Sequence, residues 1–79
     1  MRVKDIKVAK KLSVDGLIKL IKTANNFESD IMIRGTHFTI DAKSIIGMVT
    51  VLRGGIDVTI ITKGDDEEEA LRAIVKLLV

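Results

Sequence analysis

The chain has 79 residues and a formal net charge of +2 at pH 7, from 13 Lys and Arg against 11 Asp and Glu. A chain of this length predicts one domain, which buries only about 60% of the surface of its unfolded state and has no room for a deep enclosed active site. The sequence contains no Cys, which excludes disulfides and thiolate metal sites, and only two aromatic residues, Phe27 and Phe38, which indicates an aliphatic core.

The first half of the chain predicts a strand, a helix and a hairpin. Residues 3–8 form the first strand, where the apolar positions change parity and indicate a bulge or a late start. Ser13 is a predicted N-cap, with Asp15 in the first turn where the helix dipole favours a negative charge. The predicted apolar stripe of this helix consists of Val14, Leu17, Ile18, Ile21 and Ala24. The pair Asn25-Asn26 ends the helix, and the alternating segments 31–34 and 38–41 are paired strands joined by a turn at Gly35-Thr36.

The second half predicts two helices separated by one strand. Ser44 caps a short helix that reaches Thr50 or Val51, and Arg53-Gly54-Gly55 interrupts the chain after it. Residues 57–62 are rich in Val, Ile and Thr and form a fourth strand. The last helix is predicted to have Asp65 and Asp66 at its cap and Ala70, Ala73, Ile74, Leu77 and Leu78 on its apolar face.

The order of elements is therefore β-α-β-β-α-β-α. It predicts an α+β fold, a two-layer open-faced sandwich in which a four-stranded antiparallel sheet carries three helices on one face. We expect residues 1–79 to form this single domain. Because many small domains share the architecture, it assigns no function by itself.

Several segments resemble the HPr family, the phosphocarriers of the bacterial sugar phosphotransferase system. The most specific is Lys43-Ser44-Ile45-Ile46-Gly47-Met48, which is similar to the family's regulatory segment K-S-I-M-G-V. The segment Gly55 to Thr59 resembles G-A-E-I-T, and the segment Thr23 to Ile31 resembles T-A-S-x-Y-x-A-D-V. The order and spacing of these segments make the resemblance fairly specific from Thr23 to Val79.

The N-terminal third departs from the family pattern. The active-site string of the family is G-I-H-A-R-P-A, and the register places Lys11 to Leu17 there. The phosphorylated histidine becomes Ser13, the phosphate-binding arginine becomes Asp15, and the proline becomes Gly16. The resemblance thus implies a histidine-lacking, HPr-like regulator that is not an enzyme. Ser13 lacks an activating base nearby in sequence, so we expect it to act as a helix cap.

The resemblance also implies a regulatory site. Ser44 is the predicted phosphorylation site of a kinase, in addition to its capping role. Ile46, Gly47 and Val49 are predicted to dock protein partners, whereas Ile45 and Met48 are expected to be buried. The expected partners are proteins of the phosphotransferase or catabolite-control type, including an HPr kinase, and the chain is expected to be a monomer or weak dimer.

No cofactor or metal site is expected. The acidic run 65–69 fits a solvated helix start, because adjacent carboxylates point in different directions around a helix. His37 has no partner ligand nearby in sequence and is expected at the surface of the hairpin turn.

Two other functions stay open. One is a non-standard phosphocarrier that uses Ser13, and the other is a small RNA-binding domain, suggested by Lys10-Lys11, by Arg53-Gly54-Gly55 and by an isoelectric point near 9.1. The absence of Trp and Tyr, with both Phe residues at expected core positions, argues against a base-stacking surface, so no nucleic acid is expected. No apolar run approaches the roughly 20 residues that span a bilayer, and the N-terminus does not resemble a signal peptide, so the expected location is the cytoplasm, away from membranes.

Overall fold

The computed structural model describes residues 1–79 and contains the seven predicted elements in the predicted order. They are β1 (Arg2–Lys7), α1 (Val14–Ala24), β2 (Asp30–Arg34), β3 (Thr39–Asp41), α2 (Ile45–Val51), β4 (Asp57–Lys63) and α3 (Glu67–Leu78). None of the three helices has the length and apolar character needed to cross a bilayer.

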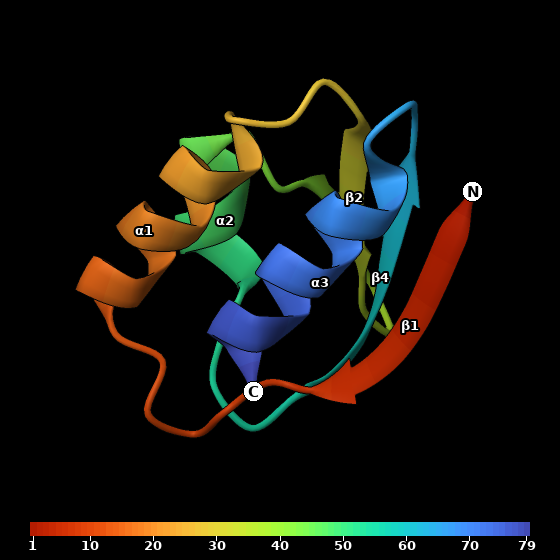
Figure 1. Cartoon of the computed structure of the whole chain (residues 1–79). Helices are drawn as coiled ribbons and strands as arrows, with labels where there is room; N and C mark the ends of the chain where they lie inside the picture. Colours follow the sequence, from red (N-terminus) through yellow and green to blue (C-terminus); the bar gives the residue numbers. More distant parts are fainter.

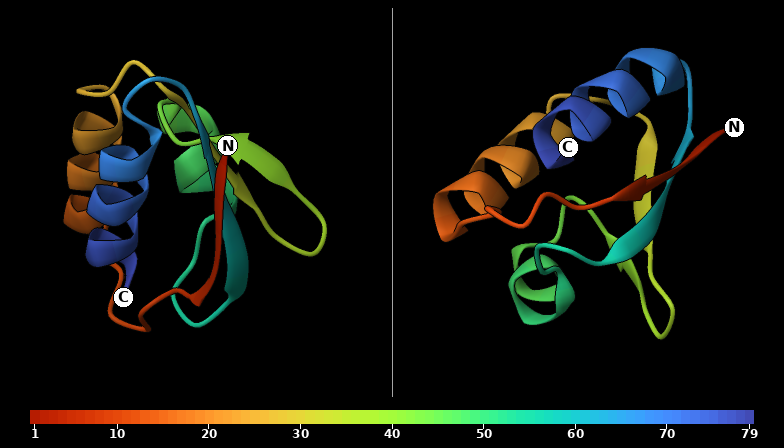
Figure 2. Two further views of the ribbon diagram at one scale, coloured as in Figure 1. Left: turned by 45° about the vertical axis from the view of Figure 1, so that its right-hand side comes forward. Right: turned by 90° about the horizontal axis from the view of Figure 1, so that it is seen from below.

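The four strands form one antiparallel sheet in the order β1-β4-β2-β3. Strand β4 lies between β1 and β2, and Ile60 at its middle is paired with Lys4 on one side and Ile33 on the other. The helices cover one face of this sheet, with α1 and α3 side by side and the shorter α2 over the β2–β3 part (Figures 1 and 2). The predicted two-layer open-faced sandwich is confirmed.

The core is aliphatic and lies between the sheet and the helices. Strands β2 and β4 supply alternate side chains to it, Ile31 and Ile33 from one and Val58 and Ile60 from the other, because successive residues of a strand point to opposite faces. The helices contribute the buried side chains Leu17, Leu20, Ala24, Met48, Ala70, Ile74 and Leu78. The two Phe residues are half-buried and packed against this core.

Strand β1 begins earlier than predicted and contains no bulge. Its register with β4 is unbroken from Arg2 to Lys7. The apparent change of parity arises because Val3 lies on the face opposite the helices and is 51% exposed, whereas Ile6 lies on the helix face and packs against the core. Strand β3 begins at Thr39 instead of residue 38, because the Phe38 carbonyl closes the turn by accepting the Gly35 N–H at 2.8 Å.

The buried face of α1 differs from the predicted stripe. Leu20 is fully buried although it was not assigned to the apolar face, while Val14 and Ile18 are 65% and 37% exposed. Helix α1 packs against both α3 and α2, and these neighbours cover a face that is rotated from the centre of the apolar stripe. The prediction was therefore wrong for these residues.

The Asp66 carboxylate links the beginning of α3 to the loop between α1 and β2. It was predicted to cap its own helix, but it makes no such side-chain hydrogen bond. Its oxygens instead accept the N–H groups of Glu28 and Ser29, both at 2.9 Å, and the Ser29 hydroxyl. Gly64 permits this approach, since a Cβ atom there would lie 2.5 Å from Ser29 Oγ and its φ of 151° disfavours other residues.

These hydrogen bonds make the free energy of unfolding depend on pH in the acid range. The Ser29 hydroxyl first, and then the Glu28 N–H, lower the pKa of Asp66 below its ordinary value of 3.8. A carboxyl group whose folded pKa is depressed contributes stability above its unfolded pKa and loses it as the pH falls through the folded pKa.

We therefore expect Asp66→Asn to lower the free energy of unfolding at neutral pH, because an amide presents one accepting oxygen instead of two. The difference from the wild type should shrink as the pH falls toward about 2, as measured by urea unfolding at several pH values. The matched control is Asp65→Asn, since Asp65 is exposed and makes no side-chain hydrogen bond. An equal effect of both substitutions would contradict this role of Asp66.

Candidate functional site

Ser13 lies at the beginning of α1 and caps it. Its backbone is extended, with φ −105° and ψ 171°, and its hydroxyl oxygen accepts the Gly16 N–H at 3.1 Å. No histidine or carboxylate is hydrogen-bonded to this hydroxyl. A serine hydroxyl becomes a strong nucleophile only beside a base, so the geometry here supports capping and provides no activation.

The residues beside Ser13 do not supply positive charge. Asp15 is exposed in the first turn of α1, where its carboxylate interacts favourably with the helix dipole. The single histidine, His37, lies exposed in the β2–β3 turn, on the opposite side of the molecule from the beginning of α1 (Figure 2). The structure therefore does not bring His37 to Ser13.

Ser44 lies at the beginning of α2 and is exposed. Its hydroxyl oxygen accepts the Gly47 N–H at 3.5 Å, a weaker contact than the cap of α1. The loop before it is held by two bonds: the Lys43 N–H donates to Asp41 Oδ1 at 2.8 Å, and Lys43 Nζ donates to the Phe27 carbonyl at 2.8 Å. The Ser44 hydroxyl thus faces solvent on a loop whose position is fixed by its neighbours.

Helix α2 presents most of its apolar side chains to solvent. Among its aliphatic residues only Met48 is fully buried, whereas Ile45, Ile46 and Val49 are 54%, 77% and 46% exposed. The expectation that Ile45 is buried was wrong: it is the first residue of α2 and keeps about half of its side chain exposed, whereas Met48, one turn later, is buried. Gly47 is half-buried and faces Ile40 of β3.

Helix α1 adds exposed aliphatic side chains beside α2. Val14 and Ile18 are one turn apart on α1, which packs against α2. We call Val14, Ile18, Ile45, Ile46 and Val49 together the helical surface. The sequence predicted Ile46 and Val49 of this surface but assigned Val14, Ile18 and Ile45 to buried faces, since local periodicity does not show how much of an apolar face is covered. Aliphatic side chains exposed together on a small domain mark an interaction site.

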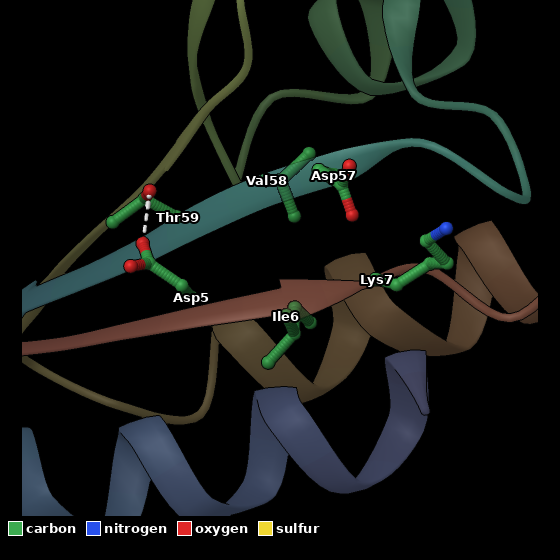
Figure 3. A pocket seen from close by; sticks show the side chains of 6 residues that line it. All are labelled: Asp5, Ile6, Lys7, Asp57, Val58 and Thr59. Carbon is green, nitrogen blue, oxygen red and sulfur yellow. Dashed lines mark hydrogen bonds between the residues drawn. The ribbon is translucent and has the colours of Figure 1, made fainter.

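A shallow hollow lies on the sheet where β1 and β4 run together (Figure 3). The carboxylates of Asp5 and Asp57 and the amine of Lys7 line it, and Asp5 Oδ1 accepts the Thr59 hydroxyl at 2.6 Å. Opposite charges are mixed there, and no group of three metal-ligating side chains exists in the structure.

The acidic run at the start of α3 is occupied by structural contacts. Glu67 Oε2 lies 2.8 Å from the Met1 amino group, and Glu67 Oε1 accepts the Gly64 N–H at 3.2 Å. The Met1 amino group and the Gly64 N–H, in that order, lower the pKa of Glu67. Glu68 forms an ion pair with Arg72 at 2.9 Å. These carboxylates tie α3 to β1 and to itself.

Comparisons with known proteins agree on one family. A family model described as "PTS HPr component phosphorylation site" matches residues 5–79. The HPr-like protein Crh of Halalkalibacterium halodurans is 37% identical over 59 residues, which are 73% of this chain and 70% of that protein. The structure of the phosphocarrier protein HPr of Bacillus anthracis superposes with a TM-score of 0.91 at 33% identity, over 99% of this chain and 96% of that one. Bacillus subtilis Crh, described as a swapped, intertwined dimer, has a TM-score of 0.75 at 30% identity, over 91% and 82% of the two chains.

The two serine caps should differ in their contribution to stability. Ser13→Ala should lower the free energy of unfolding by about 1 kcal/mol, whereas Ser44→Ala, which removes the longer contact, should cost at most about 0.5 kcal/mol. Ser13→Gly serves as the matched control and should cost only about 0.3 kcal/mol, because glycine is itself tolerated at a cap. Urea unfolding measures all three variants. A larger loss of stability for Ser44→Ala than for Ser13→Ala would contradict the inference that the shorter cap bond contributes more to the free energy of unfolding.

Proposed function

The chain belongs to the HPr family, and we propose that within it the protein is a regulatory interaction module that cannot carry phosphohistidine. It is a relative of phosphotransferase-system proteins and is not an enzyme. Two observations together support the proposal. Ser13 at the beginning of α1 has no activating base, and the exposed Ser44 lies beside exposed aliphatic side chains.

The chemistry at the beginning of α1 supports the loss of carrier function. Ser13 stands in place of the family's phosphorylated histidine, and it caps the helix without a base to activate it. Asp15 stands where the family has a phosphate-binding arginine, and its charge would repel an incoming phosphoryl group. A serine phosphocarrier would need both of these obstacles removed.

The position of Ser44 supports regulation by phosphorylation. Its hydroxyl is exposed and is held only by a 3.5 Å contact, so that a kinase can reach it without unfolding α2. A phosphate adds about −1.5 to −2 charges at pH 7. These charges would border Ile45, Ile46 and Val49, so phosphorylation would change the character of the helical surface more than the stability of the fold.

The helical surface is the proposed site for protein partners. The residues predicted to bind partners are Ile46, Gly47 and Val49, and the exposed side chains of Val14, Ile18 and Ile45 add further aliphatic area. Partners of the phosphotransferase or catabolite-control type, including an HPr kinase, fit this proposal, as does action in the cytoplasm as a monomer or weak dimer.

The RNA-binding alternative is favoured only by basic charge, since Gly54 and Gly55 lie against Lys10 and so place Arg53 in a loop next to Lys10-Lys11. Both Phe residues are half-buried against the core, which leaves no exposed aromatic side chain for stacking. The phosphocarrier alternative depends on Ser13 alone. The experiments that follow separate the phosphocarrier alternative from the regulatory proposal.

Incubation with phosphoenolpyruvate and the first enzyme of the phosphotransferase system should leave the protein unphosphorylated. Ser13→His alone should recover little acid-labile phosphate, because Asp15 still opposes the incoming anion, and the double variant Ser13→His, Asp15→Arg should recover more. Radiolabelled phosphate and acid lability provide the measurement, with a genuine HPr as positive control. Acid-stable phosphate on Ser13, or transfer of the phosphoryl group to His37, would contradict the regulatory proposal.

An ATP-dependent HPr kinase should phosphorylate the wild type on Ser44 and leave Ser44→Ala unmodified. Phosphorylation should leave the free energy of unfolding level or slightly higher, since exposed anions near a helix start stabilise by up to roughly 1 kcal/mol. Intact mass, site mapping and urea unfolding measure these outcomes.

Two further variants test the docking part of this proposal. Ile46→Ser and Val49→Ser should each lower the rate of kinase phosphorylation, while Val79→Ser, an exposed aliphatic position outside the helical surface, serves as the control. A kinase that ignores the wild type, or that modifies Ser13, would remove the proposed regulation.

A further inference from the structure

A groove runs between strand β1 and helix α3, on the side of α3 away from the helical surface. It has a volume of about 350 Å³, and its lining consists of Lys4 from β1 and Leu71, Arg72, Val75 and Lys76 from α3. A volume of this order accommodates a few side chains of a bound segment. None of these residues belongs to the site described above.

The groove combines an apolar floor with a cationic rim. Leu71 and Val75 are half-buried and packed against the core, so their exposed parts form the floor. Lys4 and Lys76 are exposed and take part in no ion pair, while Arg72 is paired with Glu68 at 2.9 Å. The positive charge is therefore left uncompensated at Lys4 and Lys76.

Strand β1 also offers free backbone groups beside this groove. It lies at the edge of the sheet with β4 as its only neighbour, and no segment covers its outer side (Figure 1). The Val8 N–H donates to the Ile56 carbonyl, and the alternation of an antiparallel pair then turns the backbone groups of Val3, Asp5 and Lys7 outward. An unpaired edge of this kind can accept another extended segment.

We propose that the groove between β1 and α3 is a second docking surface, which binds an extended acidic segment of a partner protein as a fifth strand beside β1. The backbone of the segment pairs with the outer groups of β1. Alternate side chains of a strand point to one face, so a segment of the type acidic-x-aliphatic-x-acidic places its aliphatic residue on Leu71 and Val75. Its carboxylates then lie at Lys4 and Lys76.

Charge selects this occupant over a second copy of the chain. The residues of β1 that share the helix face with Ile6 are Arg2 and Lys4, so a second copy of β1 would bring further cations, and no carboxylate, to Lys4 and Lys76. An acidic segment instead neutralises the unpaired lysines. The proposal is independent of Ser44 and the helical surface, so either can fail without the other.

The probe for the test is the peptide acetyl-Thr-Glu-Thr-Leu-Thr-Glu-Thr-amide, titrated into the isotope-labelled full chain and followed by nitrogen–proton correlation spectra. Its counterpart with Lys in place of both Glu residues serves as the comparison peptide. We expect the acidic peptide to shift the amide signals of Val3, Asp5 and Lys7 and to bind less tightly as salt is added. Lys4→Glu and Lys76→Glu should each weaken binding by about fivefold. Lys22→Glu, on the exposed side of α1, should leave it unchanged.

Reversing the charge of both lysines distinguishes loss of charge recognition of the peptide from a loss of folding caused by the substitutions. The double variant Lys4→Glu, Lys76→Glu should prefer the lysine peptide to the glutamate peptide, and its spectrum reports that it is folded. If the double variant does not fold, Lys76→Gln provides the same test with a smaller loss of affinity.

Three results would overturn the proposal. They are shifts confined to the helical surface, equal binding of both peptides by the wild type, and sedimentation with phosphatidylglycerol-containing vesicles without any response to the acidic peptide. The last result would identify an anionic membrane as the ligand in place of a protein segment.

Discussion

Strand β4 is paired on both sides, and the rest of the molecule depends on its register. Its residues Val58, Ile60 and Thr62 all point toward the helices and are buried. Pairing with β1 and β2 sets the same parity in those strands, so a slip by one residue would move apolar side chains to the open face. The three helices thus cover the apolar face of the sheet. They leave its opposite face and its two edge strands, β1 and β3, uncovered.

The three helices differ in how much of their apolar surface is buried, and this difference explains the proposed site. Helices α1 and α3 pack on each other and on the core, whereas α2 has only seven residues and buries little more than Met48. The remaining aliphatic side chains of α2 and the outer side of α1 are exposed. At the beginning of α1, Ser13 caps the helix and Asp15 lies in its first turn, so the capping role is structural whatever the outcome of the proposed loss of phosphotransfer.

Two surfaces of different character result from one architecture. The helical surface is aliphatic and borders Ser44, where an added phosphate changes its charge. The groove beside β1 is cationic and lies at the free edge of the sheet, with unpaired lysines at Lys4 and Lys76. Helix α3 separates the two, since one side faces α1 and the other faces β1. The two proposed docking surfaces therefore lie on different sides of α3, and neither depends on a deep cavity.

Local sequence determined the order of the elements and the serine caps of α1 and α2, because periodicity and cap chemistry act within a few positions. It did not determine which apolar residues of a helix are covered: Leu20 is buried while Ile18 is exposed, a difference set by neighbouring helices. Nor did it show that Asp66 binds Ser29, 37 residues away, instead of its own helix. The groove likewise joins Lys4 to Lys76 across the whole chain. Only tertiary packing brings such residues together, since no local pattern encodes a contact between distant segments.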